Sequence, residues 1–178
     1  MATPRIAPLS PHEWSEEEQV RLAPAFEAAR RYNISATLAR HPAAYEKFVA
    51  WTRHFLDEDS CALSAREREL LILRTTWLCR APYPWAQHVA IAQEEQLLSM
   101  QDIALVKQGP EAELLRAADE LHRDFLVSDA TWGRLARHYD TRQLMDVVFT
   151  CGHYTLVAMA TRSFGIELDR NLAGESWS

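Results

Sequence analysis

Residues 64–92 read SARERELLILRTTWLCRAPYPWAQHVAIA and contain two helical segments separated by a break that includes two prolines. The hydroxyl of Ser64 can cap the first helix while Glu67 returns the bond, so we expect a helix from Ser64 to about Cys79. Pro82 and Pro84 end that helix, and Pro84 also suits the first turn of the next one, where its missing N–H costs nothing. The following segment WAQHVAIAQEEQLL is then predicted to be the second helix.

The first helix of this pair is apolar on nearly every side. Its apolar side chains are Leu70, Leu71, Ile72, Leu73, Trp77 and Leu78. A helix that is apolar all round is expected to be buried. We therefore predict that residues 64–79 form the central helix of the fold and that this helix is also a candidate for a subunit contact.

Helical spacing of apolar residues recurs along the rest of the chain, and no segment alternates as a strand does. Helices are expected over 15–33, 43–58, 99–107, 111–126, 129–139 and 141–164, with a short helical turn before Pro42 and Gly165 closing the last helix. The sequence thus predicts an all-α fold of seven or eight helices with a central antiparallel helix pair. We expect one domain over 15–169, preceded by an extended lead over 1–14 and followed by a tail over 170–178.

Composition and charge narrow the possible functions. The 178 residues are 48% apolar and 25% charged, with a net charge of −6 and no long basic run, which argues against a nucleic-acid partner. No stretch approaches the roughly eighteen apolar residues that a membrane span needs, and the N-terminus has no signal-peptide pattern. The cysteines number three and lack C-x-x-C spacing, so we expect reduced thiols and a cytoplasmic protein.

Glu69 is a candidate for chemistry because it points into the apolar arc of its helix. At 100° per residue, Ile72 lies about 60° to one side of it and Leu73 about 40° to the other. A carboxylate in that position loses hydration and can exchange a proton, provided that it has a partner. The alternative is a structural ion pair with one of three nearby arginines, which are Arg66, Arg68 and Arg74.

His88 is the second candidate. It shares one face of its helix with Trp85 and Ala92, so its imidazole is expected to point inward. A neutral imidazole there can act as a general acid or base, with its tautomer fixed by a neighbouring carboxylate or hydroxyl. The alternative is a hydrogen-bonded core histidine, and periodicity does not decide between the two. His88 and Glu69 also lie at unequal distances from the turn, so simple antiparallel register would not place them side by side.

Two motifs carry a resemblance to a known family. SARERELLILR at 64–74 and YPWAQHVAIA at 83–92 are similar to the carboxymuconolactone decarboxylase-like family, which also contains the AhpD-type alkylhydroperoxidases. The likeness continues through ADELH at 118–122, DATW at 129–132 and the Gly-His-Tyr segment at 152–154. It covers most of residues 33–169. The resemblance implies an all-α fold that assembles into homotrimers or hexamers. It also implies that Glu69 and His88 meet, either within one chain or across a subunit boundary.

The peroxidase branch of that family has a Glu, a C-x-x-C whose first cysteine lies twelve residues later, and a His four residues after the second cysteine. Glu69 and His88 match this pattern, but Ala81 and Pro84 stand at the two cysteine positions. Thiol peroxidase chemistry needs an attacking thiolate and normally a second, resolving thiol. The remaining peroxidase interpretation is a hydroperoxide reductase that uses Cys79, which is otherwise expected to be a small buried hydrophobe.

The decarboxylase branch needs no cysteines and is the better match. It implies a lyase of aromatic catabolism that acts without a cofactor on a small carboxylated lactone or similar cyclic acid. His88 would be the acid/base, with Glu69 as its partner. Arg74, or the helix N-terminus at Pro84, could hold the substrate carboxylate. A third possibility is an oligomeric member of the family that has lost the reaction.

Four aromatic residues are candidates for the walls of a substrate pocket, although aromatics at helical spacing are more often core residues. They are Tyr83, Trp85, His153 and Tyr154. His122 is expected on the inward face of its helix with a structural hydrogen bond. No H-x-x-x-H or H-x-x-E-H spacing appears, so no metal site is predicted.

Overall fold

The computed structural model describes residues 4–16, 19, 27–28, 31–57, 59–109 and 112–172. These residues contain eight α-helices, two 3-10 turns and no strand, which confirms the predicted all-α fold. The helices are α3 (Asn33–Leu38), α4 (Pro42–Leu56), α5 (Ala65–Leu78), α6 (Pro82–Glu94), α7 (Met100–Gln108), α8 (Glu113–Asp124), α9 (Asp129–Leu135) and α10 (Thr141–Phe164), and the 3-10 turns are η1 (Pro11–Glu13) and η2 (Arg170–Leu172). Most of the helix expected over 15–33 lies outside the described residues.

The caps of α5 confirm the predicted start of that helix. The Ser64 hydroxyl accepts from the Glu67 N–H, and the Glu67 carboxylate accepts from the Ser64 N–H at 2.9 Å. The next helix, α6, begins at Pro82 rather than at Trp85, because both prolines fit within its first turn. It ends at Glu94, four residues before the expected end, where the backbone of Gln96 turns left-handed with φ of 56°.

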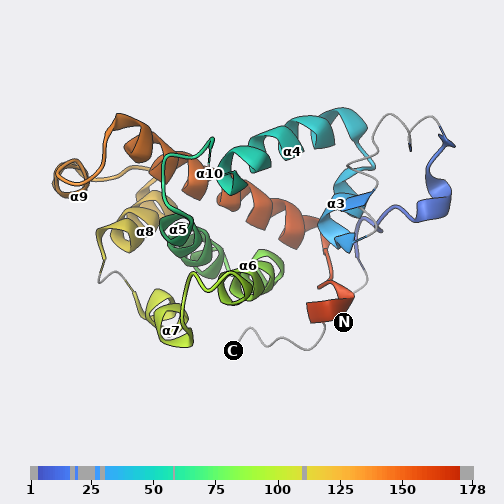
Figure 1. The fold of residues 1–178 in the computed structure, drawn as a ribbon. Helices are drawn as coiled ribbons and strands as arrows, with labels where there is room; N and C mark the ends of the chain where they lie inside the picture. The colour runs from blue at the N-terminus through green and yellow to red at the C-terminus, as the bar shows by residue number, and fades with distance from the viewer. Residues whose placement is uncertain are drawn as a thin grey trace.

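Helix α5 lies in the middle of the molecule (Figure 1). It packs against α6, α7, α8 and α10, so its all-round apolar character is explained by burial within one chain. No subunit contact is needed to cover it. Three charged residues of α5 are buried as well, and each has a hydrogen-bond partner; they are Arg68, Glu69 and Arg74.

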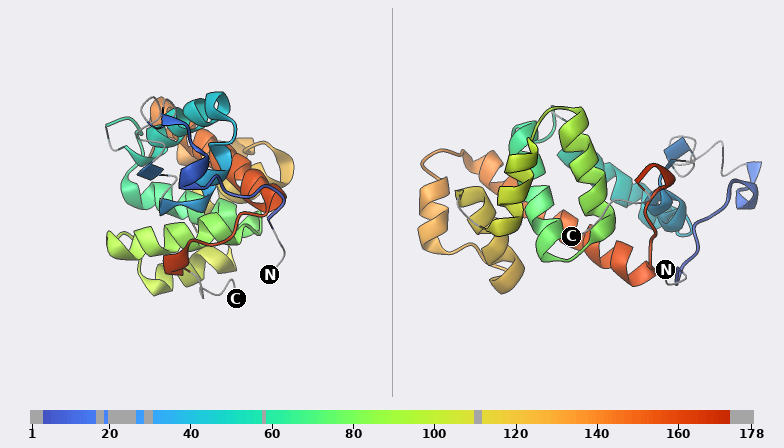
Figure 2. Two further views of the ribbon diagram at one scale, coloured as in Figure 1. Left: turned by 90° about the vertical axis from the view of Figure 1, so that its right-hand side faces the viewer. Right: turned by 90° about the horizontal axis from the view of Figure 1, so that it is seen from below.

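Helix α10 is the longest helix among the described residues and runs from α8 and α9 at one end of the molecule toward α3 at the other (Figure 2). Its bounds agree with the prediction, since Asp140 caps its start and Gly165 closes it with φ of 71°. It is long and apolar enough to cross a membrane by length and composition alone. However, 56% of the apolar window is buried, as expected for the core helix of a globular fold.

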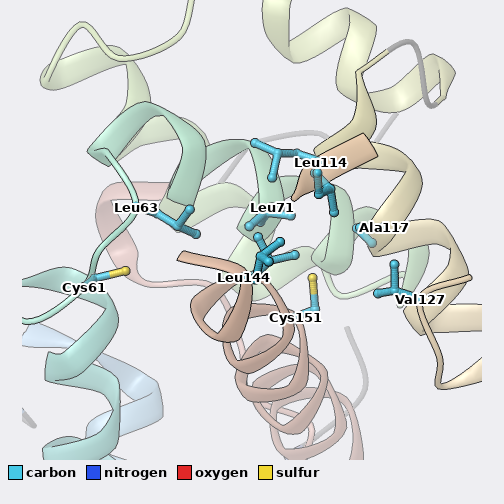
Figure 3. Close-up of a cluster of buried hydrophobic side chains, with 11 residues drawn as sticks. Cys61, Leu63, Leu71, Leu114, Ala117, Val127, Leu144 and Cys151 are labelled. Carbon is cyan, nitrogen blue, oxygen red and sulfur yellow. The ribbon is translucent and has the colours of Figure 1, made fainter. Parts of the chain in front are cut away.

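The main core joins α5, α8 and α10. Figure 3 shows Leu71 of α5 close to Leu144 of α10 and Leu114 of α8, with the thiol of Cys151 among them. A second cluster around Leu73 and Trp85 joins α5, α6 and α7. The three cysteines are free thiols; Cys61 and Cys151 are buried, and Cys79 is partly exposed.

One group of large apolar side chains remains exposed along α4 and α10. It consists of Trp51, Met145, Phe149 and Leu156, which we call the α4–α10 patch. The rings of Trp51 and Phe149 lie 5.6 Å apart, so the two helices contribute to one surface. An exposed apolar patch of this kind is a candidate surface for a contact with another molecule.

Candidate active site

Glu69 and His88 meet in the interior. Nδ1 of His88 lies 3.0 Å from each carboxylate oxygen of Glu69, and the two side chains are only 8% and 5% exposed. Glu69 lies about three residues farther from the turn than His88, which corresponds to about 4.5 Å along the helix axes. The two side chains are long enough to bridge this offset. The expectation that simple register would keep the pair apart is therefore corrected, and the meeting implied by the family resemblance is observed.

The three arginines that were alternative ion-pair partners for Glu69 form hydrogen bonds with other groups. Each finds another acceptor: Arg66 bonds Asp102 at 2.7 Å, Arg68 bonds the carbonyl of Leu63 at 2.9 Å, and Arg74 bonds Asp119 at 2.5 and 2.9 Å. His88 is thus the hydrogen-bond partner of the Glu69 carboxylate among the described residues.

A cavity of about 330 Å³ opens beside His88 between α3, α4, α6 and α10. Three other predicted site residues, Tyr83, His153 and Tyr154, line it together with His88. Glu69 is not part of the lining and contacts Nδ1 of the His88 ring. The cavity has mainly apolar and aromatic walls with a few polar groups, which is the usual character of a small-molecule site.

The hydrogen bond between Glu69 and His88 determines which ring nitrogen of His88 can exchange a proton with a ligand. An ionised carboxylate only accepts hydrogen bonds, so Nδ1 carries the proton that it shares with Glu69, and Nε2 is left to exchange a proton with a ligand. The ring of Tyr154 packs edge-on against the imidazole, with centroids 4.9 Å apart. Burial, and secondarily the charge of Glu69, raises the pKa of Tyr154 well above its usual range, so Tyr154 stays a neutral phenol.

His153 supplies a second imidazole in an uncharged state. The Thr52 hydroxyl donates to the carbonyl of Phe48 at 2.8 Å, so it accepts from Nε2 of His153 at 3.1 Å. Nδ1 of His153 is then a bare acceptor, and it is buried without a partner among the described residues. Burial, with a smaller effect of the His88 charge, lowers the pKa of His153 to about 4, which keeps it neutral near pH 7.

Tyr83 lines the cavity, and its hydroxyl binds the segment that follows α10. The hydroxyl donates to the carboxylate of Asp169 at 2.8 Å, and burial together with that carboxylate raises the pKa of Tyr83. Asp169 also accepts from Gln87 and from the backbone N–H of Asn33. The segment after α10 is thereby held against α6 and α3 beside the cavity.

The structure does not bring Arg74 or Trp85 to the cavity, which corrects their predicted place. Arg74 donates to Asp119 of α8 and to the carbonyls of Val106 and Lys107, so it ties α5 to its neighbours. Trp85 packs against Trp77, with ring centroids 5.2 Å apart. Both side chains lie on the side of the α5–α6 pair that faces α7.

Helix α4 supplies cavity residues that sequence reasoning missed. Tyr45, Thr52 and Arg53 line the cavity, and burial raises the pKa of Tyr45 although the Ser35 side chain and Arg53 act against it. The exposed guanidinium of Arg53 has no carboxylate partner among the described residues. The one signal for these residues was the helical spacing of apolar residues from which a helix over 43–58 was predicted.

No protein-family model matches the chain, and no curated protein is significantly similar to it. Solved structures do match. The AhpD-core, uncharacterized peroxidase-related protein of Ralstonia eutropha JMP134 has a TM-score of 0.77 at 17% identity, covering 97% of this chain and 95% of that one. An uncharacterized peroxidase-related protein of Silicibacter sp. TM1040 has a TM-score of 0.76 at 16% identity, with 98% of both chains covered.

A third similar structure is that of the debrominase Bmp8, a variant in complex with 2,3,4-tribromopyrrole, with a TM-score of 0.74 at 12% identity. It covers 97% of this chain and 95% of that one. At these identities the likeness shows the fold alone. The AhpD-like helical fold implied by the sequence resemblance is confirmed.

Proposed function

We propose that this protein is an enzyme that transfers a proton to or from a small carboxylated cyclic acid, most simply in a decarboxylation without a cofactor. The observation that carries the proposal is the His88–Glu69 pair, 3.0 Å apart, in which His88 lines a cavity of about 330 Å³ and Glu69 lies behind it. A buried imidazole oriented by a carboxylate is a standard acid/base arrangement.

In the proposed reaction, the bond between the ring carbon and the substrate carboxylate breaks, and carbon dioxide leaves. The electron pair moves into a conjugated carbonyl of the ring, which gives an enolate. His88 Nε2–H then protonates the carbon from which carbon dioxide left. The Glu69 carboxylate stabilises the imidazolium form of His88 that donates this proton, and a proton from water restores that form for the next cycle.

The walls of the cavity support such a substrate. Aromatic side chains keep the reacting carboxylate poorly hydrated, which favours its loss, and Arg53 is placed to attract an anion at the cavity. Nδ1 of His153 can accept a hydrogen bond from the bound ring. The complex of Bmp8 with a tribromopyrrole supports the same size class, since a small unsaturated ring is a ligand held by this fold.

Neither alternative accounts for the site as well. A non-catalytic family member would need no cavity beside His88 and Glu69. A hydroperoxide reductase would use Cys79, which does not line the His88 cavity and whose pKa is raised by burial despite the opposing effects of Thr155 and Arg162. Peroxide turnover that disappears in Cys79→Ala would favour this second alternative.

The test is a decarboxylation assay on a panel of carboxylated lactones and cyclic unsaturated acids, with carbon dioxide release as the readout. His88→Gln should lower kcat/KM by about 10²- to 10⁴-fold, the range for removal of a general acid or base. His138→Gln removes an exposed histidine outside the cavity and serves as the matched control. Equal turnover by wild type and a folded His88→Gln would refute the acid/base role.

The same assay tests the anion site. Arg53→Gln should raise KM by about tenfold with little change in kcat, because a rim charge contributes equally to the bound substrate and the transition state. Arg40→Gln is the control, since it removes an exposed arginine that pairs with Glu13 outside the cavity. An unchanged KM in Arg53→Gln would place the carboxylate elsewhere.

A further inference from the structure

A second cavity, of about 800 Å³, lies between α8 and α10 over the carboxyl end of α5. Among its lining residues is Cys79, the partly exposed member of the three cysteines. Cys151 also borders it, but its thiol is buried in the main core, and burial raises its pKa to about 12. Cys79 is therefore the thiol that a molecule in this cavity can reach.

An imidazole stands next to this thiol. Nδ1 of His122 lies 3.6 Å from Sγ of Cys79, and the His122 side chain is exposed rather than inward as the sequence predicted. Burial raises the pKa of Cys79, so the neutral thiol predominates near pH 7 and needs a base to become a nucleophile. His122 is within reach to accept that proton.

Three guanidinium groups gather on the same cavity. Arg5, Arg80 and Arg162 all line it, and none pairs with a carboxylate among the described residues. Arg162 donates to the carbonyl of Cys79 at 3.0 Å, which keeps its charge beside the thiol. The chain has a net charge of −6, so these three guanidinium groups, which have no carboxylate partner among the described residues, form a local feature that can bind an anion.

A buried polar residue also lines this cavity. Thr75 is only 2% exposed, and its hydroxyl lies beside the thiol of Cys151. Leu78, Leu121 and Phe125 supply apolar walls. The cavity thus combines a thiol, a base and three cations with room for an organic molecule.

We propose that Cys79 is a site of thiol–disulfide exchange with small disulfides that carry carboxylates. The Cys79 thiol gives its proton to Nδ1 of His122, and its sulfur attacks one sulfur of the bound disulfide. The S–S bond of the ligand breaks as a bond forms to Cys79. The other half of the ligand leaves as a thiolate and takes up a proton, so the Cys79 sulfur is oxidised and the leaving sulfur is reduced.

The arginines give the site its selectivity, since they hold the carboxylates of the disulfide while its sulfurs lie near Cys79. This activity is separate from the proposed proton transfer, because Cys79 does not line the His88 cavity. It also differs from peroxide reduction, since neither a peroxide nor a second cysteine takes part.

The experiment compares three small aliphatic disulfides that differ in charge: dianionic dithiodipropionate, neutral hydroxyethyl disulfide and dicationic cystamine. The folded protein is mixed with each, and adducts on the intact chain are followed by mass spectrometry. One adduct should form, located at Cys79, with the dianion reacting about tenfold faster than the dication at low salt. Cys79→Ser should abolish the adduct. Equal rates for the three disulfides, or an adduct that persists in Cys79→Ser, would overturn the proposal.

Two variants test the roles of the neighbours. Arg162→Gln should lower the rate with the dianion about three- to tenfold and leave the neutral disulfide nearly unaffected. Arg142→Gln is the matched control, an exposed arginine about 30 Å away along the same helix. His122→Gln should slow all three disulfides near pH 7, with the difference closing at alkaline pH as the thiolate forms unaided. A uniform effect of Arg162→Gln on all three disulfides would remove the anion site from the proposal.

Discussion

The tautomer of His88 is the residue-scale property on which the proposed chemistry depends. Glu69 accepts the Nδ1 proton, so the neutral imidazole should carry hydrogen on Nδ1 and leave Nε2 bare. Nitrogen NMR of the labelled histidine can show this without any substrate. In Glu69→Gln the side-chain amide can donate or accept, so a mixture of the two tautomers is expected. A neutral His88 ring that carries its single hydrogen on Nε2 in the wild type would contradict the assignment.

The neutral state of His153 predicts how stability depends on pH. Its pKa is about 4 in the folded protein against 6.5 for an unperturbed histidine, so the unfolded chain binds the extra proton between these values. The contribution of neutral His153 to the free energy of unfolding is therefore fully present above about pH 6.5 and is lost as pH falls toward about 4. Over the whole window it amounts to about 3 kcal/mol.

Urea unfolding of wild type and His153→Gln isolates this contribution. Gln keeps a donor for Thr52 but does not titrate in this range. Between about pH 7 and about pH 5 the free energy of unfolding of the wild type should fall by about 2 kcal/mol more than that of the variant. Parallel pH profiles would mean that His153 titrates normally in the folded protein.

The sequence was more informative about the acid/base pair than about the rest of the site. Glu69 and His88 were identifiable because each places a polar group on an apolar face, and their partnership required the family resemblance. Arg74 was mistaken for a substrate ligand because a single helix does not reveal that Asp119 of α8 faces it. Arg53 was missed for a related reason. An exposed arginine becomes a candidate ligand-binding residue only when the cavity beside it is known, and the sequence does not show that cavity.

At the scale of elements, helix ends with local signals were predictable. The start of α5 at Ser64 and both ends of α10 depend on capping interactions within a few residues, and they agree with the structure. The bounds of α6 differ because two prolines in one turn can either end a helix or begin one. That ambiguity is resolved by packing against α5, which the local sequence does not contain.

Gly165 offers a test of how α10 is closed. Its φ of 71° is left-handed, and an added Cβ would lie 3.3 Å from the backbone N of Arg5 and Cα of Pro4. Gly165→Ala should therefore lower the free energy of unfolding by about 1–2 kcal/mol, measured by urea denaturation.

The control for that substitution is Gly133→Ala in α9, where nothing lies within 4 Å of the added Cβ. Alanine favours a helix by up to about 1 kcal/mol over glycine, so this variant should be as stable as the wild type or more stable. Equal losses in the two variants would show that the left-handed backbone at Gly165 has no special cost.

At the scale of the whole molecule, the two cavities lie on different sides of the helices that they share. On α10, the larger cavity is lined by Cys151, about 160° around the helix from Phe149 of the α4–α10 patch, and by Gly152, about 60° from Phe149. The α4–α10 patch therefore borders one edge of the Cys79 cavity. Proton transfer and thiol exchange can still be tested separately, because no described residue lines both cavities.

We expect the α4–α10 patch to be the contact between copies of this chain, in the homotrimer or hexamer that the family resemblance implies. Its four large apolar side chains are 38–51% exposed and are gathered on two adjacent helices, which is typical of a surface that another molecule covers. Leu156→Glu places like charges at a contact of identical copies and should shift the assembly to monomers in analytical ultracentrifugation. Met100→Glu, at a methionine of α7 that is 63% exposed and lies outside the patch, should leave it unchanged. A Leu156→Glu variant that sediments as the wild type does would move the contact to another surface, and a monomeric wild type would exclude the assembly altogether.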